Sequence, residues 1–283
     1  MNNKPLERLA DGLCFGEGPR WHDGELWLSD MHAYEVLRFS PDGVRHPVVR
    51  VENQPSGLGW LPNGDLLIVS MRDRRVLRFD GHTLTEHADL SALASFDCND
   101  MVVDGGGRAY VGNFGFDLNA GAEPRTAELV CIEPDGAARV VAEDLMFPNG
   151  TVITPDGRTL IVAETFGARL TAFDIAANGD LSNRRTWAEL PKGAVPDGIC
   201  LDAEDGIWSA SPTTCECVRQ TRGGEITHRV EVDQGAFACM LGGPDRTTLY
   251  VLTADSSNPE ECRANRQGRI EACAAPYPAA GWP

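Results

Sequence analysis

The chain has 283 residues, of which 42% are hydrophobic and 24% charged, as in ordinary globular proteins with one large domain or two small ones. Its formal net charge of −17 makes nucleic acid and anionic membrane surfaces poor partners. The chain has no apolar run of about 18 residues that would suggest a transmembrane helix, and no apolar N-terminal stretch that would suggest a secretory signal. Its nine cysteines are scattered and do not suggest a disulfide framework, so we expect a cytoplasmic protein.

A sequence pattern recurs about every 40–50 residues, the spacing that propeller blades show. In chain order, its copies begin near residues 18, 56, 99, 149, 197 and 239. Each copy has an apolar run, a turn with glycine and a strand rich in aromatic or β-branched residues, and no amphipathic helix separates the copies. We therefore predict an all-β fold, a single six-bladed β-propeller over residues 1–283 with four-stranded blades. The last copy lacks an outer strand, which the N-terminal segment 6–10 is expected to supply.

Polar residues lie where the innermost strand of several copies begins. Glu17 precedes the first copy, Asn99 and Asn149 begin the third and fourth, and Asp197 begins the fifth. Because equivalent positions of a propeller converge on its axis, we expect these side chains to form a central metal site, since carboxylate and amide oxygens suit hard divalent cations. Pro-Asn-Gly and Pro-Asp-Gly are also ordinary turn sequences, but the other Pro-Asp-Gly turns of the chain lie at different phases of the repeat.

The turn after the second strand of each copy returns to the face where these polar residues lie, so the six turns should ring one pocket. The turns of the third and sixth copies are the longest, and we expect them to form its wall or lid. His32, in the first turn, is interpreted as a solvated turn residue. The six turns are residues 31–32, 71–72, 113–128, 164–166, 211–215 and 254–266.

On these features the chain resembles the senescence marker protein/gluconolactonase/luciferin-regenerating enzyme family. The resemblance runs from Gly16 to Glu271 and is most specific in Phe147 to Gly150 and in Pro196 to Asp202. It implies a six-bladed propeller with one catalytic divalent ion in the channel, and many members of this family hydrolyse sugar lactones.

The resemblance also implies roles for individual residues. Glu17, Asn149 and Asp197 would bind the metal ion, Asp197 would serve as the general base, and Asn99 would contact substrate or metal. Ca²⁺ is the first choice for an all-oxygen site, and Zn²⁺, Mn²⁺ or Fe²⁺ can occupy similar sites.

One departure from the family concerns substrate specificity. Asp97 stands where some lactonases of the family have an arginine that contacts sugar hydroxyls, and the pocket edge is rich in phenylalanine. We expect Phe114 or Phe116 to face the substrate and Asp117 to lie near its polar edge. Lactones with an apolar or aromatic substituent should then be accepted alongside sugar lactones.

These observations predict a metal-dependent hydrolase that opens the ring of a small-molecule lactone with metal-activated water. The chain has no Gly-x-Ser-x-Gly nucleophile elbow and no His-x-x-x-His pair, so a serine nucleophile and a histidine zinc site have little support. Two alternatives stay open, since a fold does not decide a function. One is a phosphotriester or fluorophosphate hydrolase on the same site, and the other is a non-enzymatic, calcium-binding scaffold.

Overall fold

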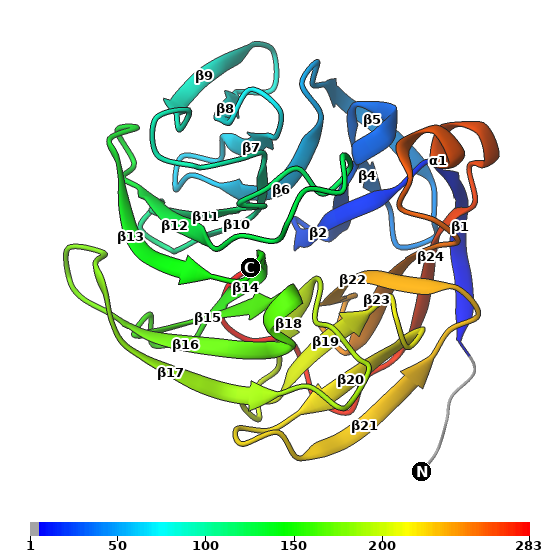
Figure 1. The fold of residues 1–283 in the computed structure, drawn as a ribbon. Helices are drawn as coiled ribbons and strands as arrows, with labels where there is room; N and C mark the ends of the chain where they lie inside the picture. Colours follow the sequence, from blue (N-terminus) through cyan, green and yellow to red (C-terminus); the bar gives the residue numbers. More distant parts are fainter. Residues whose placement is uncertain (1–5) are drawn as a thin grey trace.

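Six antiparallel four-stranded sheets surround a central axis in the computed structural model, which describes residues 6–283 (Figure 1). In five of these sheets, four consecutive strands follow one another outward from the axis. In the sixth sheet, the first strand of the chain lies outermost. The six-bladed propeller with four-stranded blades that the repeat predicts is therefore confirmed.

The strands are short, and tight turns separate them. Blades 1 to 3 consist of β2 (Gly16–His22), β3 (Glu25–Asp30), β4 (Glu35–Phe39) and β5 (Arg45–Arg50); β6 (Pro55–Trp60), β7 (Leu66–Ser70), β8 (Arg75–Phe79) and β9 (Leu84–Asp89); and β10 (Cys98–Val103), β11 (Ala109–Asn113), β12 (Ala127–Ile132) and β13 (Ala138–Leu145). Blades 4 to 6 consist of β14 (Pro148–Ile153), β15 (Thr159–Glu164), β16 (Arg169–Ile175) and β17 (Leu181–Glu189); β18 (Ile199–Leu201), β19 (Ile207–Ser211), β20 (Glu216–Gln220) and β21 (Ile226–Glu231); and β22 (Gly235–Gly242), β23 (Thr248–Ala254), β24 (Gly268–Ala274) and β1 (Glu7–Leu13).

The ring is closed by strands from both ends of the chain. β1 pairs antiparallel with β24, with Glu7 opposite Ala272 and Leu13 opposite Gly268. The N-terminal strand thus completes the sixth blade, as predicted, and covers the outer edge of β24, which would otherwise present unpaired backbone groups.

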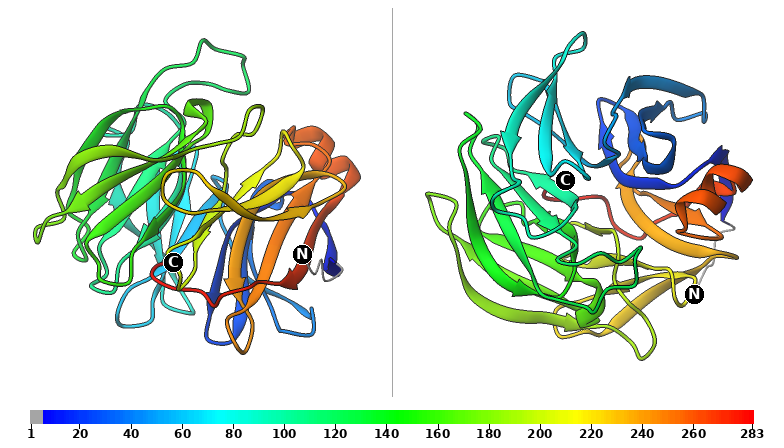
Figure 2. Two further views of the ribbon diagram at one scale, coloured as in Figure 1. Left: turned by 90° about the horizontal axis from the view of Figure 1, so that it is seen from below. Right: turned by 45° about the horizontal axis from the view of Figure 1, so that its top comes forward.

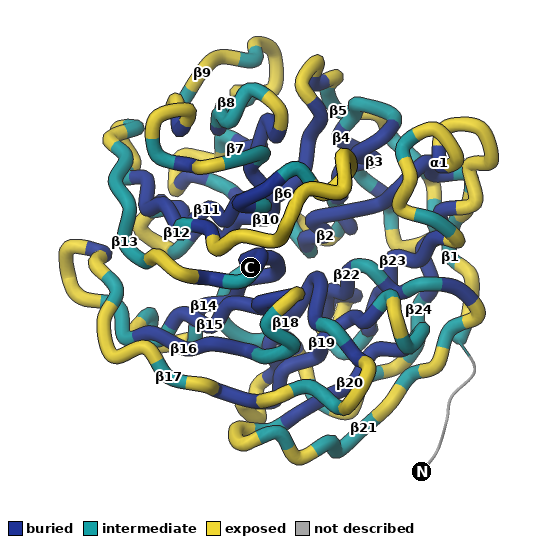
Figure 3. Tube along the Cα trace, in the orientation of Figure 1, coloured by how far each residue is buried: buried dark blue, intermediate teal, exposed yellow. Residues whose placement is uncertain are grey.

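The inner strands of the blades are more buried than the outermost strands (Figure 3). Every residue of β10 and β14 is buried. A Cβ added to Gly150 would lie 2.5 Å from the backbone nitrogen of Ile199, and one added to Gly198 would lie 2.7 Å from the Cα of Ala238. Only glycine lets the innermost strands of neighbouring blades approach this closely. The residue before each of these glycines is thereby held beside the axis.

The two faces of the propeller carry different segments. The C-terminal segment crosses one face, where Trp282 pairs with Ile153 at the end of β14. The long loop between β11 and β12 rises from the opposite face (Figure 2). On that face the helix α1 (Pro259–Asn265) packs against the 3₁₀ turn η1 (Met31–Ala33), and a second 3₁₀ turn, η2 (Thr165–Gly167), follows β15. Within residues 6–283, no helix is long and apolar enough to cross a membrane.

Candidate metal and active site

A pocket of about 260 Å³ opens on the face where the innermost strands begin. Each of the six predicted turns contributes at least one side chain to its lining, which confirms that they ring one pocket. The turns are represented, in chain order, by Met31, Met71, Phe114, Thr165, Pro212 and Ser257.

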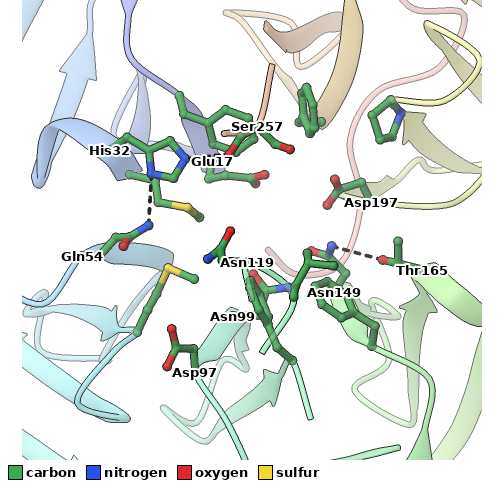
Figure 4. Close-up of a pocket in the computed structure, with 18 of the residues that line it drawn as sticks. Glu17, His32, Gln54, Asp97, Asn99, Asn119, Asn149, Thr165, Asp197 and Ser257 are labelled. Carbon is green, nitrogen blue, oxygen red and sulfur yellow. Dashed lines mark hydrogen bonds between the residues drawn. The ribbon is translucent and has the colours of Figure 1, made fainter. Parts of the chain in front are cut away.

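The four polar residues predicted at the innermost strands all line this pocket (Figure 4). Glu17 lies on β2, Asn99 on β10 and Asn149 on β14, and Asp197 lies just before β18. Their exposed fractions are 8%, 5%, 6% and 8%, respectively. These residues, which we call the central cluster, are therefore brought together from four blades. Their roles toward a metal ion and a substrate stay predictions.

Among the described residues, the two carboxylates of the central cluster have no positively charged partner. Glu17 accepts one hydrogen bond, from the backbone nitrogen of Gly18 at 3.3 Å. The buried guanidinium of Arg20 pairs instead with Asp100, at 2.7 Å. Neither Glu17 nor Asp197 forms an ion pair within residues 6–283. Because a buried carboxylate without a partner costs free energy, the pair fits a bound cation.

The two amides of the central cluster turn their nitrogens toward protein acceptors. Asn149 Nδ2 donates to Thr165 Oγ1 at 3.2 Å, as Figure 4 shows, and Asn99 Nδ2 donates to the carbonyl oxygen of Pro148 at 3.5 Å. The amide oxygens are thereby left for the pocket. The donor set is two carboxylates and two amide oxygens, which suits a hard divalent cation. No group of three His, Cys, Asp or Glu residues that could hold a metal ion occurs in the described part of the chain.

The electrostatics of the central cluster oppose two free negative charges. Burial raises the pKa of Glu17 well above its ordinary value, and the nearby carboxylates of Asp197 and Asp100 raise it further. Burial likewise raises the pKa of Asp197 to about 8. Both shifts mean that the charged form of the carboxyl group is disfavoured. A divalent cation bound by both carboxylates would lower both pKa values and keep the two groups ionised.

The loop between β11 and β12 does not place Phe116 and Asp117 on the lining of this pocket. Phe116 is 5% exposed and lies behind the side chains that line the pocket. Asp117 borders a neighbouring cavity and accepts a hydrogen bond from the backbone nitrogen of Ala120 at 2.9 Å. From this loop, Phe114, Leu118 and Asn119 reach the main pocket instead, and Asp97 lines it as well. Substrate contact by Phe116 and Asp117 stays a prediction.

His32 is buried, with 5% of its surface exposed, so its interpretation as a solvated turn residue is wrong. The loop of blade 6 covers it. Gln54 Nε2 donates to His32 Nδ1 at 3.2 Å, and His32 Nε2 donates to the carbonyl oxygen of Ser257 at 3.2 Å. Burial lowers the pKa of His32 to about 4, so the ring is neutral at pH 7. The ring thus joins the first residues of blade 2 to the turns of blades 1 and 6.

Two pocket residues, Gln54 and Thr165, were given no role by the sequence reasoning. Gln54 stands before Pro55 as Phe147 stands before Pro148, and both Gln54 and Phe147 have positive φ, of 74° and 61°. Aligning these two copies of the repeat residue by residue would have found Gln54. The predicted turn 164–166 brings Thr165 to the pocket, but no sequence signal marks its hydrogen bonds to Asn149 of the same blade and to Pro196 before blade 5.

A comparison with known protein families gives a clear result. Residues 15–255 match the model described as the SMP-30/Gluconolactonase/LRE-like region. The chain belongs to this family. The match covers most of the chain and confirms the resemblance seen in the sequence.

Members of the SMP-30/gluconolactonase/LRE-like family similar to this chain carry several names. Regucalcin of Xenopus laevis is 26% identical over 89% of this chain and 87% of its own length. The 6-deoxy-6-sulfogluconolactonase of Pseudomonas putida is 24% identical over 87% of this chain and 85% of its own length. Among solved structures, a calcium-binding regucalcin of Agrobacterium tumefaciens superimposes with a TM-score of 0.80 at 22% identity, over 97% of this chain and 95% of that one. Figure 1 thus shows the propeller of this family.

Proposed function

We propose that this protein is a metal-dependent lactonase that binds one divalent cation, with Ca²⁺ as the first choice, through Glu17, Asn149 and Asp197. The observation that carries the proposal is the central cluster, in which two buried carboxylates without cationic partners meet two amide oxygens at a small-molecule pocket. The similarity to a 6-deoxy-6-sulfogluconolactonase supports lactone hydrolysis as the reaction. The description of the Agrobacterium protein as calcium-binding supports Ca²⁺ as the cation.

The residues of the pocket account for the chemistry. A bound cation would supply Lewis acidity toward the ester carbonyl. Asp197 takes a proton from water as the water oxygen attacks the carbonyl carbon. The bond from that carbon to the ring oxygen then breaks, and the proton passes from Asp197 to the leaving oxygen, which yields a hydroxy acid. Thr165 holds the amide of Asn149, and Asn99 contacts either the substrate or the cation.

The test uses the purified protein and a panel of substrates. We expect glucono-δ-lactone or another lactone of the panel to be hydrolysed, chelation to abolish this activity, and added Ca²⁺ or another divalent cation to restore it. Asp197→Asn should lower kcat by more than the 10²–10⁴-fold that is typical of one general base, because the change also removes a metal-binding charge. Glu17→Gln should weaken the calorimetric affinity for the cation more than Asn99→Ala does.

Several outcomes would overturn this proposal. Lactone hydrolysis that chelation leaves unchanged would place the reaction outside the central cluster. Hydrolysis of a phosphotriester but of no lactone would identify the alternative hydrolase. Tight Ca²⁺ binding without turnover of any substrate would identify a scaffold.

A further inference from the structure

One wall of the pocket consists of phenylalanine rings from two neighbouring blades. The rings of Phe114 and Phe147 lie 4.4 Å apart, and Phe147 meets Phe166 edge-on at 5.1 Å. Phe116 packs behind them, 5.6 Å from Phe166. The first three of these residues line the pocket, whereas Phe116 supports the wall from the protein side.

This wall continues outward as an exposed apolar rim. Only three large hydrophobic side chains are well exposed within residues 6–283, and two of them, Phe166 at 45% and Leu118 at 42%, lie at this pocket. The third, Val44 at 49%, lies in the turn between β4 and β5, away from the pocket. Apolar surface gathered beside a pocket is typical of a ligand-binding site, because a bound molecule removes that surface from water.

The backbone of Phe147 fixes the position of its ring in this wall. Its φ of 61° lies in the left-handed region, which a residue as bulky as phenylalanine seldom adopts. Gln54, which stands before Pro55 in the second copy of the repeat, has a φ in the same region, so the packing of the repeat holds this conformation in place. Here the strained residue comes two positions before Asn149 of the central cluster and places its ring in the pocket lining.

The rest of the pocket lining combines apolar side chains, such as Phe15 and Met71, with polar ones. His32 and Gln54 are joined by a hydrogen bond, and Arg72, Asp97 and Asn119 also line the pocket. Figure 4 shows His32, Gln54 and Asp97 on the opposite side of the central cluster from Thr165, the residue that precedes Phe166. A ligand whose ester group lies at the central cluster therefore meets the phenylalanine wall on one side and a mixed polar and apolar lining on the other.

We propose that Phe114, Phe147, Phe166 and Leu118 form a subsite for an apolar or aromatic substituent on the ring of the lactone, so that substituted lactones are preferred over their unsubstituted parents. This inference rests on the proposed function and names its substrate class. The ester group lies at Glu17, Asn149 and Asp197, and the substituent lies against Phe166 and Leu118 at the pocket mouth.

The experiment compares two lactones and three variants. The substrates are δ-valerolactone and the same ring with a pentyl group on the carbon bonded to the ring oxygen. The wild type should show a higher kcat/KM for the pentyl compound, and Phe166→Ala and Leu118→Ala should each reduce that preference by about tenfold, the effect of losing one apolar contact in a pocket. Val44→Ala is the matched control, since it removes an equally exposed apolar side chain elsewhere, and its preference should equal that of the wild type. Thermal unfolding establishes that each variant is folded.

A binding measurement separates this inference from the proposed function. The δ-lactam with the same pentyl group should bind the wild type more tightly, by calorimetry, than the unsubstituted δ-lactam, and Phe166→Ala should reduce the difference. Substituent-dependent lactam binding without hydrolysis of any lactone would overturn the lactonase and leave the subsite intact. Equal kcat/KM values for the two lactones in the wild type, or an equal loss for both in Phe166→Ala, would overturn the subsite and leave the lactonase intact.

Discussion

The hydroxyl group of Thr165 connects two members of the central cluster. It accepts a hydrogen bond from Asn149 Nδ2 at 3.2 Å and donates one to the carbonyl oxygen of Pro196, the residue before Asp197, at 2.8 Å. One side chain thus orients the amide of Asn149 and holds the backbone that carries Asp197. Because Thr165 acts through its neighbours, we expect it to be a positioning residue for the proposed metal site.

Replacing Thr165 by valine tests this role, because valine keeps the shape of threonine and lacks the hydroxyl group. We expect Thr165→Val to weaken Ca²⁺ binding by about 10–100-fold, as is usual when a partner that orients a ligand residue is removed. Thr165→Ser keeps the hydroxyl group and should restore most of the affinity. Calorimetric titration measures both variants, and an affinity unchanged in Thr165→Val would contradict the positioning role.

At the scale of secondary-structure elements, the side chain of His32 joins three blades. The residue lies in η1 of blade 1, receives a hydrogen bond from Gln54 just before β6, and donates one to Ser257 in the loop that leads to α1. α1 in turn packs against η1. The loop of blade 6 is therefore held over the pocket edge by a neutral histidine.

Protonation of His32 should loosen this connection. Its pKa is lowered by burial from 6.5 to about 4, so between these pH values the unfolded chain binds a proton that the folded protein does not. The stabilising contribution of neutral His32 is complete above about pH 6.5 and falls as the pH decreases toward 4. Between pH 7 and pH 5 we expect a loss of about 2 kcal/mol from this residue.

Urea unfolding of wild type and His32→Asn at pH 7 and pH 5 measures this contribution. Both proteins carry the same carboxylates, so the difference between their pH dependences isolates His32. The wild type should lose more unfolding free energy than the variant over this interval. Identical losses in both proteins would show that His32 titrates normally in the fold.

At the scale of the whole molecule, the propeller depends on the apolar contacts of its closing strand. Leu13, the last residue of β1, is fully buried and belongs to the core cluster that also contains Leu252 of β23 and Ile270 of β24. Blade 6 therefore combines the first strand of the chain with three strands from more than 200 residues later. A substitution in β1 should destabilise the closed ring and not only the N-terminus.

Leu13→Ala tests this closure. We expect the free energy of unfolding to fall by about 2–5 kcal/mol, the usual cost of a cavity left by a buried leucine. Unfolding in urea, followed by far-UV circular dichroism, gives the value, with Val44→Ala as a control at an exposed site. A loss in Leu13→Ala no larger than in the control would mean that β1 adds little to the stability of the ring.

The sequence by itself determined the architecture and the members of the central cluster. The repeat predicts six blades, and the incomplete last copy predicts that the N-terminal segment closes the ring. Glu17, Asn99, Asn149 and Asp197 could be named in advance because equivalent positions in a propeller converge on the axis. The glycines after Asn149 and Asp197 belong to this signal, since the innermost strands approach too closely there for any side chain.

Only the tertiary structure decided which side chains of the long turns reach the pocket. The loop between β11 and β12 has no periodic pattern, so its sequence could not show that Phe114 and Leu118 line the pocket while Phe116 packs behind Phe166. The burial of His32 depends on Ser257, a partner 225 residues away along the chain. Such contacts arise where turns of different blades pack together, and no local sequence pattern records that packing.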